Sequence, residues 1–521
     1  MGNNISKFNR RDFIKITSAG VAATMLAQCR TFPSEKKPNI LFVAVDDLRP
    51  ELGCYGNDYV ISPNIDRLAD NGITFRQAHC QSAVCNPSRA SLLTGLRPDT
   101  IKVWDLRTKL RDNVPDVVTL PQYFKKNGYH TVGIGKIYHN TIPDDQSWSE
   151  AKLHIKGYPF DPDAVYRSEQ GVEAIENKKA KIIEEGREER FIDRIGEWYL
   201  KAQAYEMPDV PDNAYFDGAQ TDIAIDKLAE LKDKDKPFFF GVGYYRPHLP
   251  FNAPKKYWDM YKREEIPLAE NDFVPKNAPI MAINNLRELR GYSDFKHIVH
   301  PTEGTLTDEE ARVLKHGYLA SVSYIDAQVG RLMNKLKELG LDKNTIVILW
   351  GDHGWKLGEH ASWCKMTNYE IDTRVPMIIS TPETKAQNIH TDRLVEFVDI
   401  YPTLCDMAGL EIPKGLEGYS AAPLIDKPNR PWKKAVFSQF LREGIWKSPD
   451  GIEYMGYSIR TERYRYNEWI NWETKELAGI ELYDHETDPD ENENIAGKPE
   501  HVELIKDLAI QLKAGWKKAL P

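Results

Sequence analysis

Long apolar runs are absent from this sequence, and cysteine is scarce. No stretch of the 521 residues reaches the roughly 18 consecutive apolar residues that a membrane-spanning helix needs. Six cysteines are too few for a disulfide framework in a chain of this length. An excess of basic residues is also missing: 69 Lys and Arg face 78 Asp and Glu, a formal charge of −9, which argues against a nucleic-acid partner. The 41% of hydrophobic residues nevertheless predicts a folded globular chain.

Residues 1–29 predict an export signal. The pair Arg10-Arg11 precedes a short run of apolar and small residues that ends at Gln28, a pattern that resembles bacterial twin-arginine signals. Cys29 then stands where lipoproteins carry their lipid, although Gln28 departs from the small residue usual before that cysteine. We therefore expect an exported, periplasmic protein. A lipid anchor at Cys29, cleavage that releases the protein, and an ordinary basic N-terminus stay open as alternatives.

Strands alternate with helices along most of the remaining chain. The run from Asn39 to Asp46 is continuously apolar until two aspartates end it, which is typical of a buried parallel strand. Further strands are predicted at 129–135, 237–243, 344–351 and 375–380, and helices at 62–72, 119–127 and 308–339. This alternation predicts an α/β fold with a large, mostly parallel sheet sandwiched by helices.

The pattern changes after about residue 425. Residues 434–440 and 454–469 alternate like antiparallel strands, and an amphipathic helix is predicted near 500–518. We expect a main domain over 36–425 and a smaller C-terminal α+β subdomain over 426–521. Residues 150–210 are charged and irregular in pattern, which indicates a surface insertion.

Two pairs of polar residues directly follow apolar strands. These are Asp46-Asp47 and Asp352-His353. Ligands bind at the carboxyl edge of the strands in open α/β sheets, so these side chains can converge. Crowded carboxylates repel one another unless a hard cation lies among them, and oxygen ligands suit Ca²⁺ or Mg²⁺. A single aspartate at a strand end is more often a cap or turn residue, but two such pairs favour a cation site.

The string Val84-Cys-Asn-Pro-Ser-Arg-Ala-Ser-Leu-Leu-Thr-Gly95 contains a second chemical signal. Pro87 at a first helical position places Cys85 just before a helix N-terminus, where backbone N–H groups favour an anion. An unmodified thiol there is a candidate nucleophile, and a small buried filler is the alternative. The complete Cys-x-Pro-Ser-Arg string resembles the signature of the type I sulfatases.

The resemblance extends over most of the chain and is closest to the iduronate-2-sulfatase branch of that family, in the alkaline phosphatase superfamily. It rests on motifs at 45–56, 135–139, 243–251, 352–360, 455–461 and 481–484. It implies that Cys85 is oxidised to formylglycine (3-oxoalanine) by a formylglycine-generating or anaerobic sulfatase-maturating enzyme. It also implies one Ca²⁺, with the ligands Asp46, Asp47, Asp352, His353 and the modified Cys85. Many sulfatases have asparagine at the position of His353. The histidine found here is instead similar to the iduronate-2-sulfatase branch.

The same resemblance implies roles for residues around Cys85. One oxygen of the hydrated aldehyde would attack sulfur. Arg89, one helical turn after Cys85, would hold the diol and the cation shell in place. Lys136 and His139 would anchor the diol and remove its second proton, which expels sulfate and regenerates the aldehyde.

Two further positions match the leaving-group and sulfate-binding residues of the family. His248 would protonate the departing alcohol oxygen. Lys365 would neutralise sulfate charge, with the nearby Lys356 as the alternative. Trp355 and Trp104 are equally compatible with stacking on a sugar and with a place in the core.

We therefore predict hydrolysis of a carbohydrate O-sulfate. The specific expectation is the 2-O-sulfate of a non-reducing-end uronic acid in oligosaccharides from glycosaminoglycan or algal polysaccharide. Phosphodiester or phosphonate hydrolysis at the same sheet edge is the alternative, although the second set of zinc ligands common in phosphatases is not evident. A non-catalytic carbohydrate-binding protein is a third interpretation. The overall acidity favours short oligosaccharide ends over long sulfated polymers.

Overall fold

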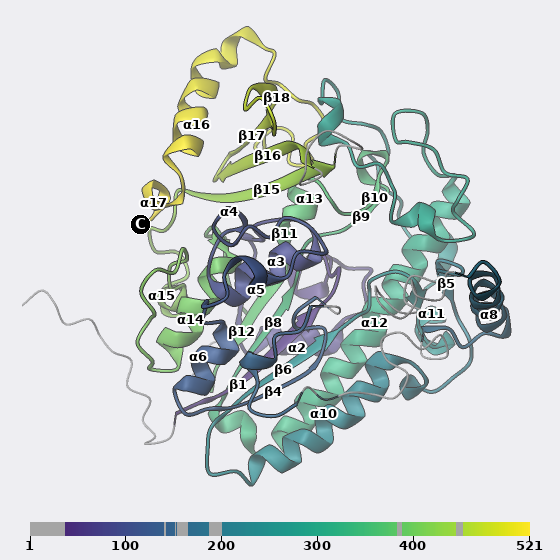
Figure 1. The fold of residues 1–521 in the computed structure, drawn as a ribbon, viewed down its shortest axis with the longest axis vertical. Coiled ribbons are helices and arrows are strands. Elements are labelled where there is room, and N and C mark those ends of the chain that lie inside the picture. The colour runs from purple at the N-terminus through teal and green to yellow at the C-terminus, as the bar shows by residue number, and fades with distance from the viewer. Residues whose placement is uncertain are drawn as a thin grey trace, which may run out of the picture.

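A seven-stranded sheet forms the centre of the protein in the computed structural model (Figure 1). In spatial order its strands are β13 (Ile389–Thr391), β2 (Ile73–Phe75), β12 (Met377–Ser380), β8 (Thr345–Gly351), β1 (Asn39–Val45), β6 (Phe238–Tyr244) and β4 (His130–Gly135). Among these described strands, β12 alone runs antiparallel to its neighbours, β8 and β2. The predicted mostly parallel sheet is thus confirmed, and the five predicted strands begin and end within two residues of the observed ones.

The structure describes residues 37–139, 142–151, 153, 165–186, 201–382, 388–443 and 452–521. The predicted export signal with Cys29, and part of the predicted insertion at 150–210, lie outside these residues.

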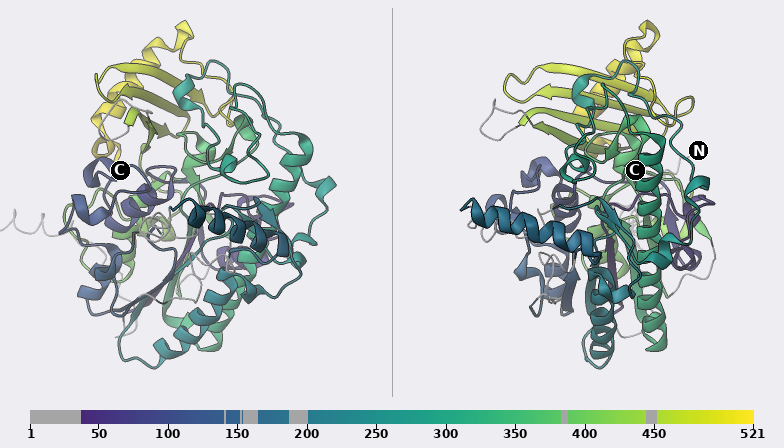
Figure 2. Two further views of the ribbon diagram at one scale, coloured as in Figure 1. Left: turned by 45° about the vertical axis from the view of Figure 1, so that its right-hand side comes forward. Right: turned by 90° about the vertical axis from the view of Figure 1, so that its right-hand side faces the viewer.

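Both faces of the sheet are covered, because every residue of β1 is buried and successive side chains point to opposite faces. Leu41, Val43 and Val45 belong to one core cluster, which includes residues of α10 (Phe216–Lys232) and α12 (Asp308–Glu338). The alternate residues of β1 belong to a second cluster, with residues of α3 (Cys85–Thr94), α6 (Leu120–Lys126) and α14 (Ile400–Met407). Helices α10 and α12 pack side by side on the face of the sheet that the first cluster covers (Figures 1 and 2).

Local sequence signals account for the long helix. Thr307 and Glu310 form a capping box at the start of α12, so the backbone donors of the first turn are satisfied. The other α-helices described before residue 430 are α2 (Pro63–Asp70), α4 (Pro98–Ile101), α5 (Leu110–Asn113), α8 (Glu169–Glu184), α11 (Lys255–Trp258), α13 (Glu370–Thr373) and α15 (Ala422–Asp426). The short strands described in this part are β3 (Ala78–His79), β5 (Tyr205–Glu206), β7 (Phe251–Asn252), β9 (Lys356–Leu357), β10 (Trp363–Cys364), β11 (Arg374–Val375) and β14 (Val395–Glu396).

A four-stranded antiparallel sheet follows and lies at the top of the molecule in Figure 1. It contains β15 (Ala435–Glu443), β16 (Ile452–Thr461), β17 (Tyr464–Asn471) and β18 (Leu477–Asp484), and α16 (Val502–Ala514) and α17 (Trp516–Ala519) complete the unit. The predicted single segment 454–469 is in fact two strands. Its alternation continues through the turn at Glu462 and Arg463, which are not the glycine, asparagine or proline typical of turns.

The C-terminal sheet holds the chain that leads into α3. Ser438 on β15 donates its hydroxyl to the Cys80 carbonyl (2.6 Å), and the Gln439 N–H donates to the Gln81 carbonyl (2.8 Å). The segment before Cys85 is therefore held in place by β15 of the C-terminal sheet.

The described part of the insertion is more regular than predicted. Residues 169–184 form helix α8, whose N-terminus is capped by the Ser168 hydroxyl, and β5 pairs with β7. Only Gly171 and Ile175 of this helix are buried, so its sequence lacks the repeated apolar positions that predict a helix. The five described cysteines are all free, and no described helix has the length and apolar character needed to span a bilayer.

Candidate active site

The two pairs of strand-end residues meet at the carboxyl edge of the sheet. Val45 and Gly351 are partners in neighbouring parallel strands, so the residues that follow them leave the sheet side by side. The Asp47 N–H donates to Asp352 Oδ1 at 3.0 Å. Asp47 has a left-handed φ of 58°, a conformation that costs energy outside glycine and is concentrated at functional sites. The predicted convergence is therefore observed.

Helix α3 brings Cys85 to the same place. The helix begins at Cys85 rather than at Pro87, because a proline is tolerated in a first turn, where its missing N–H has no helical partner. Cys85 Sγ lies 3.3 Å from His353 Nε2. Burial and the Asp46 carboxylate raise the pKa of the Cys85 thiol to about 12, so the unmodified side chain is a neutral thiol at neutral pH. The alternative of an unmodified thiolate nucleophile is not supported by this environment.

Arg89 ties the strand ends together from α3. Its guanidinium is completely buried and donates through Nε to Asp352 Oδ2 (2.9 Å) and through Nη2 to Asp46 Oδ1 (3.1 Å). Nη1 donates to the carbonyl oxygens of Lys136 and Ile137. One side chain thus fixes β1, β8 and the segment after β4, and the planar fork of arginine suits this geometry better than the point charge of lysine.

Two glycines allow the segment after β4 to approach the site. Gly135 has a φ of 71°, and a Cβ there would lie 2.0 Å from the Gly243 carbonyl oxygen. A Cβ on Gly243 would meet the backbone of Lys136 at 2.3 Å. Because neither side chain exists, Lys136 turns inward, and its Nζ forms an ion pair with Asp46 Oδ2.

Lys136 and His139 differ in charge. Burial disfavours the charged form of Lys136, but Asp46 outweighs it and raises the lysine pKa. Burial and the positive charge of Lys136 hold the pKa of His139 well below its ordinary value. The site therefore holds a cationic lysine and a neutral imidazole with only 8% of its surface exposed.

His248 and Lys365 lie beside Asp47. Lys365 Nζ lies 3.0 Å from both carboxylate oxygens of Asp47 and 2.9 Å from Glu288 Oε1. His248 Nε2 lies 3.2 Å from the same Glu288 oxygen and 3.9 Å from Asp47 Oδ2. Burial and Lys365 lower the pKa of His248 to about 4, while Glu288 and Asp46 act in the other direction.

Two sequence ambiguities are resolved by position. Lys356 Nζ donates to Thr367 Oγ1 at 2.9 Å and pairs with Asp372, so Lys365 is the lysine of this cluster. Trp355 is fully buried beneath Lys365, whose Nζ lies 4.8 Å from its ring centroid, and cannot stack on a sugar. Trp104 packs edge-on against Trp472 at 5.5 Å between ring centroids, outside the cluster.

Sequence reasoning missed Glu288. It lies in an irregular stretch between two short turns, follows no strand and belongs to no recognised motif. A charged residue in such a stretch is usually solvated, so no local signal could have placed it beside Lys365.

The donor set fits a hard divalent cation. Ligand atoms of Asp46, Cys85, Asp352 and His353 lie within 4.8 Å of one another, and a second group joins Asp46, Asp47, Cys85 and His248. Burial raises the pKa of Asp47, Lys365 lowers it, and the neighbouring Asp46 charge raises it further, which is the repulsion that a cation would relieve. His353 Nδ1 lies 3.0 Å from the Gly354 carbonyl, so in the neutral ring Nδ1 carries the hydrogen and Nε2 faces the cluster with its lone pair.

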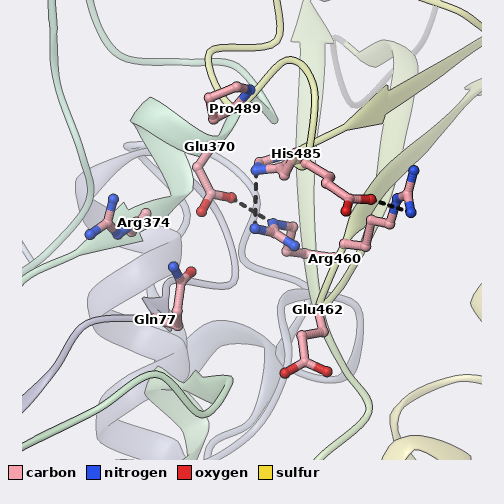
Figure 3. Close-up of a pocket in the computed structure, with 9 residues that line it drawn as sticks. Gln77, Glu370, Arg374, Arg460, Glu462, His485 and Pro489 are labelled. Atoms are coloured by element: carbon pink, nitrogen blue, oxygen red, sulfur yellow. Dashed lines mark hydrogen bonds and ion pairs between the residues drawn. The ribbon is translucent and has the colours of Figure 1, made fainter.

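A second polar cluster lies between α13 and the C-terminal antiparallel sheet, around a cavity of about 550 Å³ (Figure 3). Glu370, His485 and Glu491 come close enough to suggest a metal site. However, Arg460 donates to Glu370 (3.0 Å) and to His485 Nδ1 (3.0 Å), as Figure 3 shows, and Arg465 pairs with Glu491 (2.6 Å). Arginines already neutralise these acceptors, so this cluster is an ion-pair network that joins α13 to the C-terminal sheet.

Comparison with known proteins identifies the chain. The sulfatase family model matches residues 38–410, and a model described as N-sulphoglucosamine sulphohydrolase, C-terminal, matches residues 358–518. Iduronate 2-sulfatase of Mus musculus is 34% identical over 532 aligned residues, which cover 90% of this chain and 93% of that protein.

Solved structures share the fold. A protein in complex with its substrate D-glucosamine-2-N,6-O-disulfate matches with a TM-score of 0.69 and 24% identity, over 92% of this chain and 97% of that one. A phosphonate monoester hydrolase of Agrobacterium radiobacter matches with a TM-score of 0.67 and 21% identity, over 92% and 96%. The family model matches most of the chain, and the relative at 34% identity is a sulfatase: this protein belongs to the sulfatase family, whose members hydrolyse sulfate esters.

Proposed function

We propose that this sulfatase removes the 2-O-sulfate of a uronic acid at the non-reducing end of an oligosaccharide from glycosaminoglycan or algal polysaccharide. The observation that carries the substrate proposal is the 34% identity with mouse iduronate 2-sulfatase across 90% of the chain. The buried cations beside Cys85 support an anionic group in the pocket, since Arg89, Lys136 and Lys365 are all at most 1% exposed.

Sulfatases generally use a formylglycine and a divalent metal. We propose that Cys85 is the residue converted here, by a formylglycine-generating or anaerobic maturating enzyme, and that one Ca²⁺ is held by Asp46, Asp47, Asp352 and His353. Together these groups would supply a hydrated aldehyde as nucleophile towards sulfur and a positive charge beside it. The neutral thiol of Cys85 fits this proposal, because an unmodified side chain at this position is a poor nucleophile.

The proposed tasks of the surrounding residues follow from their charge and position. Lys365 binds the sulfate group, since its ammonium lies at the cluster beside Asp47. Lys136 orients the nucleophile. The neutral His139 accepts a proton from the nucleophile at an imidazole nitrogen, which a cationic histidine could not do.

His248 is the proposed acid. Its Nδ1 faces the Leu249 carbonyl at 2.5 Å, and its Nε2 faces Glu288 and the cluster. Both ring nitrogens face acceptors, so the acid is the imidazolium form, which carries a hydrogen on each nitrogen and can pass the one at Nε2 to the departing alcohol oxygen, which leaves poorly unless it is protonated. Burial and Lys365 lower the pKa of His248 to about 4, and the negative charge of a bound sulfate ester would raise it again and favour this form.

A panel of saturated and unsaturated disaccharides, each sulfated at the 2-O, 3-O, 4-O or 6-O position, tests the substrate. Release of sulfate from the 2-O-sulfated uronate at a kcat/KM at least about tenfold above the other isomers is expected, since each tenfold in rate corresponds to about 1.4 kcal/mol of transition-state binding. Faster turnover of a phosphonate monoester or phosphate diester in the same assay would establish phosphoryl transfer instead.

Cys85→Ser tests the nucleophile. The variant should fold with the wild-type melting temperature but release no sulfate. Peptide mass spectrometry of the wild-type protein should show Cys85 with the mass of an aldehyde rather than a thiol. Full activity of a protein whose Cys85 is entirely unmodified would exclude the formylglycine proposal.

A further inference from the structure

Glu288 is the one acidic side chain at the site that is neither a proposed metal ligand nor part of a motif, within the described residues. Its Oε1 lies 2.9 Å from Lys365 Nζ and 3.2 Å from His248 Nε2. It therefore contacts the proposed sulfate-binding cation and the proposed acid at the same time. Its side chain is 11% exposed.

The other oxygen of Glu288 is an unused acceptor. Oε2 is buried and has no hydrogen-bond partner among the described residues. Burial works against the charge of Glu288, but Lys365 and His248 hold its pKa well below the ordinary value, so the group is a carboxylate. A buried, charged oxygen without a donor is costly, which makes a donor supplied from outside the protein favourable.

The backbone around Glu288 is held in place. Lys201 Nζ donates to the Glu288 carbonyl oxygen at 3.0 Å and lies 4.6 Å from the centroid of the Tyr292 ring. Asn284 donates its amide to the carbonyl oxygen of Trp363 at 3.3 Å, which ties the same segment to β10. An acceptor fixed in this way is preorganised for one donor position.

We propose that Glu288 determines specificity: its Oε2 accepts a hydrogen bond from the substrate hydroxyl on the carbon next to the sulfate ester. The inference rests on the proposed function, because it takes His248 as the group that meets the ester oxygen. Neighbouring oxygens on a sugar ring are about as far apart as hydrogen-bonded atoms, so a ligand whose ester oxygen faces His248 presents the adjacent hydroxyl to Glu288. A second sulfate or a carboxylate at that position would be repelled by the same oxygen.

A cycle of two enzymes and two substrates tests this assignment. The wild type and Glu288→Gln are each assayed with the 2-O-sulfated uronate disaccharide and with its 3-deoxy analogue. Lys365 and His248 both need an acceptor, so the amide oxygen of glutamine takes the place of Oε1 and its NH₂ group faces the substrate. Glu443→Gln, which removes an exposed partner of Arg287, is the matched control.

In the wild type, loss of the hydroxyl should lower kcat/KM by about 10- to 100-fold, as expected for a hydrogen bond to a charged group. In Glu288→Gln this ratio should be at least about fivefold smaller, and in Glu443→Gln it should equal the wild-type ratio. The ratio is measured within one protein preparation, so a partly folded variant still reports it. Equal ratios in the wild type and Glu288→Gln would overturn the assignment.

A second pair of ligands separates this inference from the proposed substrate. trans-1,2-Cyclohexanediol monosulfate and cyclohexyl sulfate differ by the same hydroxyl and contain no uronic acid. Their inhibition constants against 4-nitrophenyl sulfate should differ in the wild type and converge in Glu288→Gln. If that holds while the uronate is not hydrolysed, the substrate proposal fails and Glu288 stands. If the uronate is hydrolysed without a hydroxyl preference, the role of Glu288 fails alone.

Discussion

Arg89 and Arg463 make the same number of ion pairs in very different surroundings. Arg89 binds Asp46 and Asp352 with a side chain that is 1% exposed. Arg463 binds Asp484 and Glu486 with a side chain that is 47% exposed. The two arginines therefore separate the effect of burial from the effect of pairing.

Arg89→Met should strongly destabilise the protein. The substitution leaves two buried carboxylates without their shared cation, and removing one partner of a buried pair costs about 3–5 kcal/mol. Arg463→Met removes an ion pair that water already screens and should destabilise the protein far less than Arg89→Met. The free energy of unfolding from urea titration, monitored by intrinsic fluorescence, measures both values.

Addition of Ca²⁺ to both variants provides a further test of this comparison. If Asp46 and Asp352 hold Ca²⁺, excess Ca²⁺ should recover part of the loss in Arg89→Met, because it restores positive charge between them. The same addition should leave the difference between Arg463→Met and the wild type unchanged. Equal losses in the two variants, or a loss below about 1 kcal/mol in Arg89→Met, would refute the argument from burial.

Three further outcomes are expected. Lys365→Met should lower kcat/KM for sulfate release by about 100-fold or more, because Lys365 lies at the cluster. Lys356→Met should mainly lower the melting temperature, because Lys356 binds Asp372 outside the cluster. The opposite pattern would contradict the assignment of Lys365. Treatment with EGTA should lower both activity and melting temperature, and Ca²⁺ should restore them; no change in either quantity would remove the metal proposal. Burial opposes the charge of Glu491, but Arg465 and His485 lower its pKa from an ordinary 4.5 to about 2. The Glu491 carboxylate therefore stabilises the fold above pH 4.5, and this contribution is lost as the pH falls towards 2. The unfolding free energy of Glu491→Gln should accordingly vary less than that of the wild type over this window, and parallel pH curves for the two proteins would contradict the ion-pair network.

Several parts of the site were predictable because their signals are local. Apolar runs that end in Asp46-Asp47 and Asp352-His353 indicated strand ends, and parallel strands bring their carboxyl ends to one edge. The string around Cys85 carried its own helix-start signal, and only the first helical residue was misplaced.

Other parts depended on contacts between distant segments. The choice between Lys356 and Lys365 could not be made from a span of ten residues, because the two lysines bind different partners after the chain folds. Glu288 was not predictable, since its contacts to His248 and Lys365 bridge segments 40 and 77 residues away in sequence. The internal turn at 462–463 was missed because alternation alone does not report where a strand reverses.

The sequence by itself determined the parallel α/β order, the strand-end carboxylates and the Cys85 string, because each depends on residues adjacent in the chain. Tertiary structure alone decided which cations surround those carboxylates, which nitrogen of His353 faces them, and that a carboxylate oxygen of Glu288 lacks a partner among the described residues. The physical reason is that charge pairing and desolvation depend on distance in space, and the ion pairs of Arg89, Lys136 and Lys365 join segments that lie far apart in the chain and meet only in the folded protein.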